Sequence, residues 1–174
     1  MAGPPSDTAP PETEDDGSTS PARLIEIVLD EETVPRRSAE IEHERRVAIF
    51  DLLEDNEFRP AGVPDGPYGL HLRLADGRLV LDIRDGDKTH LRSIILALTP
   101  FRRIIREYFQ VCESYFAAIK TAPPSRIEAL DMGRRALHNE GSSLLRARLD
   151  GKVALDNNTA RRLFTLICVL HARG

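Results

Sequence analysis

The most constraining feature of this sequence is a strict alternation of apolar and polar residues on both sides of Asp76-Gly77, a dipeptide typical of two-residue hairpin turns. A turn of that length fixes which residues of the two strands face each other. The sequence therefore predicts a β-hairpin over residues 68–83 with one apolar face. The expected pairs on that face are Leu74 with Leu79, Leu72 with Leu81 and Leu70 with Ile83.

The same register places His71 opposite Asp82 on the outer face of the hairpin. Asp85-Gly86 signals a second turn, after which residues 90–98 are expected to form the third strand of a meander. Residues 23–30 also alternate, and they predict a separate first strand.

Capping signals delimit the first two helices. Ser38 is the expected N-cap of a helix that ends near residue 56, and Thr99 is the expected N-cap of a helix with Pro100 at its first position. This second helix, to about Lys120, has a continuous apolar stripe, which predicts that one side of it is buried. The stripe consists of Phe101, Ile105, Tyr108, Cys112, Tyr115, Phe116 and Ile119.

Two further helices follow. Pro123-Pro124 precedes a long helix over residues 125–149, and an extended piece at 152–155 leads to Asp156, the expected N-cap of a last helix over 157–172. Strands followed by a run of helices indicate an α+β fold. We expect a four-stranded, mostly antiparallel sheet, built as a strand, a helix and a three-strand meander, followed by three packed helices.

The last helix is apolar almost all round, since only Arg161, Arg162 and Thr165 interrupt it. Such a helix is buried either inside its own chain or against a partner. Two interpretations stay open. One is self-association into a homo-oligomer through this helix or a neighbouring surface, and the other is a fully enclosed core helix.

Residues 1–21 hold five of the 28 acidic side chains, five prolines and no lysine or arginine. Because they have almost nothing to bury, they are expected to form a disordered acidic tail before a single domain over residues 22–174. That domain keeps 23 acidic and all 24 basic side chains. This near-neutral balance argues against nucleic-acid binding.

No apolar run reaches the roughly 18 residues of a membrane helix, and the N-terminus has no signal-peptide pattern. Cys112 and Cys168 lie in apolar stretches, which favours buried, reduced thiols over a disulfide or a reactive thiol. The sequence thus predicts a soluble, cytoplasmic protein with no membrane contact.

The sequence contains neither a Gly-rich phosphate loop nor a Gly-x-Ser-x-Gly motif, and we expect no cofactor. Glu40, Glu42, His43 and Glu44 crowd the first helix, but a zinc-binding helix has two histidines one turn apart. A solvated charged face is the simpler interpretation, and no metal site is expected.

Arginine makes up 21 of the 24 basic residues. Codon bias in a GC-rich bacterial genome explains this skew, and recognition of planar anions by guanidinium groups is the functional alternative. Arg102 and Arg103 lie in the first turn of their helix, where the macrodipole disfavours cations but attracts an anion. They are either ordinary surface arginines or a secondary anion site.

The long helix contains poor helix formers between Asp131 and Gly141. Gly133 and Gly141 each cost about 1 kcal/mol relative to alanine, and Asn139 is also unfavourable. Gly133, Leu137 and Gly141 share one i, i+4 row. Such rule-breaking indicates either close approach of another element or a functional site.

Two arginines fall on apolar stripes. Arg134 lies on one between Asp131 and His138, and Arg45 lies on the apolar side of the first helix. A buried arginine needs a carboxylate or an anionic ligand, because an unpaired buried charge is very costly. Two interpretations are therefore open. Either the arginines form internal salt bridges, Arg134 with Asp131 and Arg45 with a glutamate of its own helix, or they line a pocket for an anionic ligand.

Four segments in the same order resemble a family of uncharacterised conserved alphaproteobacterial proteins of the UPF class. They are RRSAEIEHER (36–45), LTPFRR (98–103), DMGRRALHNEG (131–141) and TARRLFTLICVLHARG (159–174). The resemblance runs from about residue 22 to residue 174. It implies a bacterial, cytoplasmic setting, and it brings no activity, ligand or catalytic residue with it.

The leading hypothesis is a non-enzymatic binding or regulatory module, because no catalytic signature is present. The alternative is a small enzyme that acts on an anionic metabolite. An anionic small molecule is the expected ligand of the pocket that this alternative requires. The residues of that pocket would be Arg45, Arg134, His138, Asp131 and Asn139.

Overall fold

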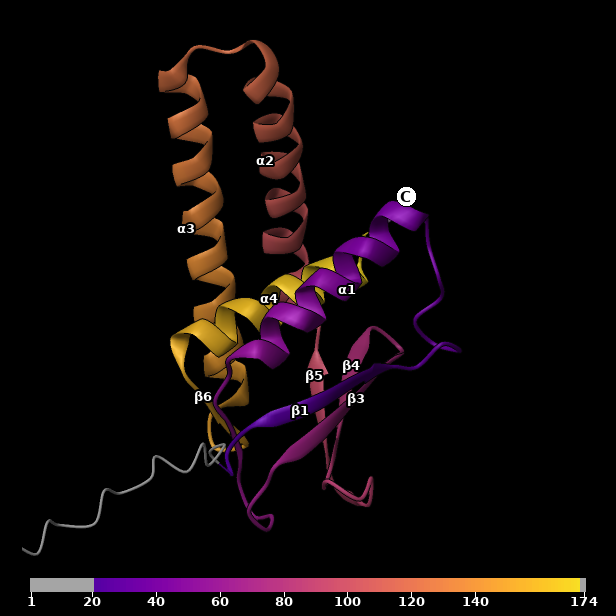
Figure 1. The fold of residues 1–174 in the computed structure, drawn as a ribbon. Coiled ribbons are helices and arrows are strands. Elements are labelled where there is room, and N and C mark those ends of the chain that lie inside the picture. The colour runs from indigo at the N-terminus through magenta and orange to yellow at the C-terminus, as the bar shows by residue number, and fades with distance from the viewer. Residues whose placement is uncertain (1–20, 173–174) are drawn as a thin grey trace, which may run out of the picture.

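The computed structural model describes residues 21–172 (Figure 1). Apart from Pro21, the predicted acidic tail lies outside the described residues. A four-stranded sheet has the order β1-β3-β4-β5, in which β1 and β3 are parallel and the other neighbours are antiparallel. The expected α+β fold with a mostly antiparallel sheet is confirmed. The strands are β1 (Leu24–Leu29), β3 (Tyr68–Ala75), β4 (Arg78–Arg84) and β5 (His90–Ala97).

The β3–β4 hairpin has the predicted register. Asp76 and Gly77 have φ angles of 51° and 71°, as a two-residue turn with both central residues in the left-handed region requires. His71 and Asp82 are paired on the outer face, also as predicted. The apolar pairs on the inner face are Leu70–Ile83, Leu72–Leu81 and Leu74–Leu79.

The helices cover one face of the sheet. They are α1 (Ala39–Glu54), α2 (Arg102–Thr121), α3 (Pro124–Leu149) and α4 (Asn157–Leu170). In Figure 1, α1 and α4 lie side by side over the sheet, and α2 and α3 form a hairpin that rises away from this layer. Within residues 21–172 no helix combines the length and the apolar character needed to cross a bilayer.

The predicted caps of α1 and α4 are present, since Ser38 and Asp156 each accept a hydrogen bond from the amide three residues later. Thr99 does not cap α2. It begins a short 3-10 turn, η1 (Thr99–Phe101), in which the amide of Phe101 bonds to the carbonyl of Leu98. The tight turn leads directly into α2, which has no side-chain cap.

α4 is the centre of the core. Its residues Leu163, Phe164, Leu166 and Ile167 are at most 1% exposed, because α4 packs against α1 and α3 and joins the apolar face of the sheet in one core. This enclosed position accounts for its nearly continuous apolar sequence. Self-association through a neighbouring surface stays a prediction.

A second, two-stranded sheet was not expected from the sequence. β2 (Phe58–Pro60) pairs antiparallel with β6 (Val153–Leu155), whereas the sequence predicted only an extended piece at 152–155. Strands of three residues are too short for alternation to reveal, and their pairing joins segments that are far apart in the chain.

Candidate functional site

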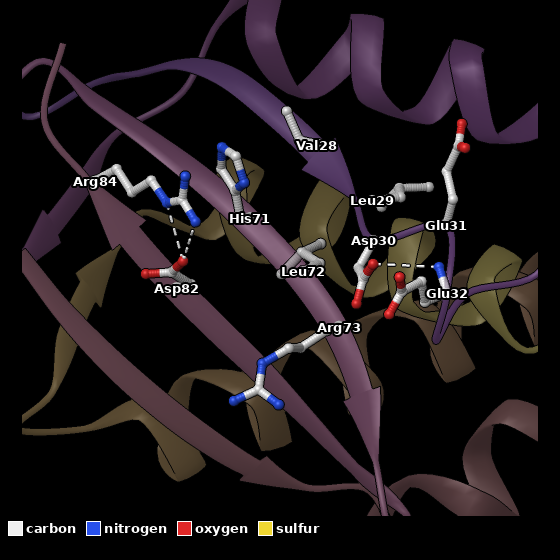
Figure 2. A pocket seen from close by; sticks show the side chains of 10 residues that line it. All are labelled: Val28, Leu29, Asp30, Glu31, Glu32, His71, Leu72, Arg73, Asp82 and Arg84. Carbon is white, nitrogen blue, oxygen red and sulfur yellow. Dashed lines mark hydrogen bonds and ion pairs between the residues drawn. The ribbon is translucent and has the colours of Figure 1, made fainter. Parts of the chain in front are cut away.

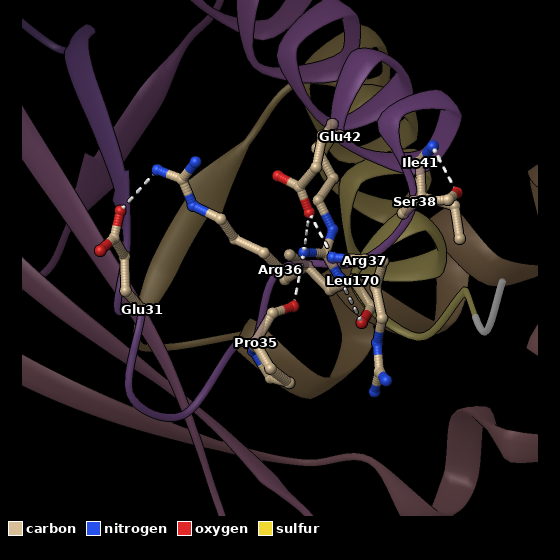
Figure 3. A network of polar contacts seen from close by, with 9 residues as sticks. Glu31, Pro35, Arg36, Arg37, Ser38, Ile41, Glu42 and Leu170 are labelled. Carbon is tan, nitrogen blue, oxygen red and sulfur yellow. Dashed lines mark hydrogen bonds and ion pairs between the residues drawn. The ribbon is translucent and has the colours of Figure 1, made fainter.

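Arg45 is 3% exposed and ties the start of α1 to the end of α4. Its guanidinium donates to the Glu42 carboxylate at 2.9 Å and to the Pro35 carbonyl at 3.0 Å. It also donates at 3.4 Å to the carbonyl of Leu170, the last residue of α4 (Figure 3). The salt bridge within its own helix is therefore present, and the guanidinium is engaged by a carboxylate and two carbonyls.

Arg134 is less buried than its place on an apolar stripe suggested, with 36% of its side chain exposed. It lies 2.6 Å from Asp131, and its guanidinium carbon is 4.8 Å from the centre of the Tyr115 ring on α2. The hydrogen bond to Asp131 raises the pKa of Arg134. Asp131 also binds Arg135 at 3.0 Å, so two cations share this carboxylate.

His138 is part of the packing between α2, α3 and α4. Its ring stacks on Tyr108 with 5.9 Å between centres, and the ring of Phe164 lies 5.8 Å away. Its Nε2 is 2.5 Å from the hydroxyl oxygen of Thr165, whose proton goes to the carbonyl of Arg161. Nε2 is therefore the donor to Thr165, and burial lowers the pKa of His138, which favours the neutral ring.

The five residues of the expected anion pocket do not form one pocket. Asp131, Arg134 and His138 follow one another along α3, and Asn139 is exposed beside them. Arg45 instead contacts the segment before α1, through Pro35, and the C-terminal end of α4, through Leu170. None of the five lines either of the two hollows described below, and anion binding by them stays a prediction.

The first hollow, of about 560 Å³, lies on the open face of the sheet beside β1 and β3 (Figure 2). Its Asp82 binds Arg84 at 2.8 Å and His90 at 2.5 Å. The Nε2 atom of His71 is buried there without a hydrogen-bond partner. The carboxylate of Asp82 is thus already paired on two sides, and the exposed Arg73 is the arginine of this hollow that has no such pairing within residues 21–172.

The second hollow is a groove of about 1040 Å³ between α2, the segment that leads into α1 and the end of α4. Its apolar lining comes from four different parts of the chain. These residues are Leu74, Leu98, Ile105, Phe109 and Leu170. We call it the α2 groove.

Three arginines line the α2 groove. Arg102 and Arg106 come from the first two turns of α2, and Arg37 comes from the segment before α1. All three are exposed, and within residues 21–172 their guanidinium groups have no hydrogen bond or ion pair. Figure 3 shows the Arg37 side chain extending away from the network around Glu42. The groove therefore combines an apolar floor with unpaired cations.

Arg102 and Arg103, the residues of the expected secondary anion site, have different surroundings. Arg102 opens into the α2 groove, whereas Arg103 binds Glu107 at 2.8 Å and also pairs with Glu140 on α3. Arg103 is thus a bridge between α2 and α3. Two carboxylates also line the groove, Glu44 on α1 and Glu113 farther along α2.

The groove lacks an activated nucleophile. Cys112 lines it, but burial raises the pKa of that thiol, and burial raises the pKa of Cys168 as well. A protonated thiol is a poor nucleophile and a poor metal ligand. In the described part of the chain no group of three histidine, cysteine, aspartate or glutamate side chains could hold a metal ion. The arrangement is suited to binding an anion with an apolar body.

Sequence reasoning missed the α2 groove. One signal was available, because Arg102, Arg106 and Phe109 recur at helical spacing on one face of α2. Arg37 and Leu170 gave no such signal. They line the groove because the start of α1 and the end of α4 lie close together in the fold.

The fold and the groove define a class of protein: a small α+β protein with a helical hairpin beside an open, arginine-lined groove. Residues 21–173 match the model of the family described as Uncharacterised protein family (UPF0262), and the chain belongs to this family. The family resemblance noted from the sequence is thereby confirmed.

Named relatives come from alphaproteobacteria. The chain is 62% identical over 151 residues to a UPF0262 protein of Rhodospirillum rubrum, covering 87% of this chain and 93% of that protein. It is 59% identical over 152 residues to a UPF0262 protein of Rhizobium meliloti, covering 87% and 96%. A UPF0262 protein of Paramagnetospirillum magneticum is also 59% identical, with 87% and 97% covered. No solved structure matches the chain.

Proposed function

We propose that this chain is a non-enzymatic, cytoplasmic binding module whose α2 groove takes an amphipathic anion, meaning an apolar body that bears a carboxylate, sulfonate or phosphate. The observation that carries the proposal is the set of unpaired guanidinium groups of Arg37, Arg102 and Arg106 around an apolar floor. A guanidinium fork matches the planar oxygens of such a head group.

The order of side chains along α2 gives the ligand an orientation. Arg102 and Arg106 come first, and Phe109 and Phe116 follow one and three turns beyond Arg106. The anionic head would lie at the inner end of the groove, and the apolar body would run outward along α2. Phe116, which is 64% exposed, would lose contact with water on binding, and this burial favours the complex.

The test uses two fluorescent probes that differ mainly in charge. 8-Anilinonaphthalene-1-sulfonate carries a sulfonate on an apolar ring system, and N-phenyl-1-naphthylamine has the same rings without it. The folded protein is expected to bind the sulfonate probe at least about ten times more tightly, because two or three guanidinium contacts add charge-assisted hydrogen bonds.

The decisive variant is Arg102→Gln combined with Arg106→Gln. It should weaken binding of the sulfonate probe about tenfold or more and leave binding of the uncharged probe unchanged. Arg126→Gln with Arg148→Gln is the matched control, since both are exposed arginines on α3 outside the groove. Equal binding of the sulfonate probe to the variant and the control would refute the proposal.

A further inference from the structure

Three side chains of α2 that line the groove lack ion-pair partners within residues 21–172: Arg102, Arg106 and Glu113. Arg106 and Glu113 are both exposed and both line the α2 groove. Neither forms an ion pair within residues 21–172. They are seven residues, or about two helical turns, apart on one face, which puts them about 10 Å apart along the axis and beyond each other's reach.

We propose that α2 of a second copy of this chain docks antiparallel onto this face, so that the protein self-associates through a two-fold interface. The inference goes beyond the proposed function, because it assigns a protein partner to the same groove. A two-fold axis beside Phe109 and Gln110 brings Arg106 of each copy opposite Glu113 of the other. One symmetric contact thus forms two ion pairs, one on each side of the axis.

The charge order excludes the parallel arrangement. Two parallel α2 helices in register would place Arg106 against Arg106 and Glu113 against Glu113, and like charges repel. Only the antiparallel pairing converts these groups into two ion pairs. The sequence of α2 is thus self-complementary when one copy is reversed.

The apolar residues support the same pairing. Phe116 is 64% exposed although it belongs to the apolar stripe of α2. In the antiparallel dimer, Phe116 of the second copy reaches the first turn of α2, where Leu98 and Ile105 line the groove. Figure 1 shows that α2 rises away from the sheet layer together with α3.

The proposed dimer is small, and it covers part of the α2 groove. One helix of about five turns buries little surface, and interfaces below about 1,200 Å² are typically transient. The dimer is therefore weak, and it forms in the upper micromolar range. Because it covers Arg106, the dimer excludes the amphipathic anion, so self-association and ligand binding oppose each other.

Sedimentation velocity at low ionic strength tests the pairing through charge reversal. The full-length chain is expected to dimerise as its concentration rises, and added salt should weaken the dimer. Arg106→Glu and Glu113→Arg should each abolish it, because each places like charges face to face. The double variant with both changes should restore it, because the ion pairs are re-formed in reverse.

Matched controls guard against unspecific effects. Arg126→Glu and Glu128→Arg reverse exposed charges on α3 and should leave the dimer intact. Circular dichroism should show every variant folded, since all these side chains are exposed. A monomer at all concentrations, or failure of the double variant to restore what the single variants lose, would overturn the inference.

The sulfonate probe separates this inference from the proposed function. The monomeric Glu113→Arg variant should bind the probe at least as tightly as the original chain, because the groove is no longer covered. If the charge-swap pattern holds but the probe does not discriminate by charge, only the ligand proposal fails. If the probe discriminates but the chain stays monomeric, only the dimer fails.

Discussion

The ring of Phe164 on α4 occupies the space that a β-carbon on Gly141 of α3 would need. An ideal β-carbon built there overlaps three carbons of the ring, whereas one built on Gly133 meets only Val111 Cγ2, at an ordinary 3.6 Å. Close approach of another element therefore explains one of the two internal glycines of α3. For Gly133 no such contact requires the absence of a side chain.

Gly141→Ala and Gly133→Ala should consequently change stability in opposite directions. Overpacking against the buried Phe164 should lower the free energy of unfolding of Gly141→Ala by about 1–3 kcal/mol. Gly133→Ala should raise it by up to about 1 kcal/mol, because alanine favours a helix. Urea denaturation of both variants measures the difference, and a Gly141→Ala variant as stable as Gly133→Ala would contradict the packing explanation.

Arg45→Met should destabilise the protein by about 2–4 kcal/mol, because it leaves the Pro35 and Leu170 carbonyls and the Glu42 carboxylate without their buried donor. Arg46→Met is the neighbouring control on the exposed side of α1 and should change stability by no more than about 0.5 kcal/mol. Equal unfolding midpoints for the two variants would show that the Arg45 network is dispensable.

Arg134→Met should destabilise the protein only slightly, by about 1 kcal/mol or less, since the side chain is partly exposed and Asp131 keeps Arg135 as a partner. Part of that loss comes from the contact with the Tyr115 ring. If Arg134 instead served to bind an anion, its removal would relieve unbalanced positive charge. A variant that melts above the original chain would then support the anion-binding interpretation over the structural one.

Protonation of His138 should lower the free energy of unfolding in mildly acidic solution. Burial, Arg161 and Arg134 lower its pKa in the folded state, so the unfolded chain, with a pKa near 6.5, takes up the proton first. The contribution of His138 is therefore present above about pH 6.5 and is lost as the pH falls through that value towards the folded pKa. His138→Gln should flatten the stability profile between about pH 7 and pH 5. His43→Gln, at an exposed position of α1, is the control, and identical slopes for both variants would count against this assignment.

Deleting residues 1–20 should leave the melting temperature unchanged within about two degrees, because apart from prolines their only apolar side chains are Met1, Ala2 and Ala9. The boundary is sharp. Ala22 is 3% exposed, and its carbonyl accepts the amide of Phe58 at 2.8 Å. A deletion that extends through Ala22 should lower the melting temperature clearly, and a large drop for the shorter deletion would show that the tail docks on the domain.

Several local elements could be predicted from short stretches of sequence. Alternation around Asp76-Gly77 predicted the hairpin register, because the period of a strand and the length of a turn are local properties. Ser38 and Asp156 marked the starts of α1 and α4 for the same reason. Arg45 was correctly expected to be buried, since a charge on an apolar stripe is visible in any helical projection, whereas Arg134 is only partly buried.

The way in which those elements combine could not be predicted from local sequence. The parallel pairing of β1 with β3, the small sheet of β2 and β6 and the enclosure of α4 depend on contacts between distant segments. The α2 groove is the clearest case. Arg37, Arg102 and Leu170 come from three distant parts of the chain and line it together only in the folded protein. Periodicity along a chain reports which face of a helix is apolar, but packing alone decides which part of that face remains uncovered.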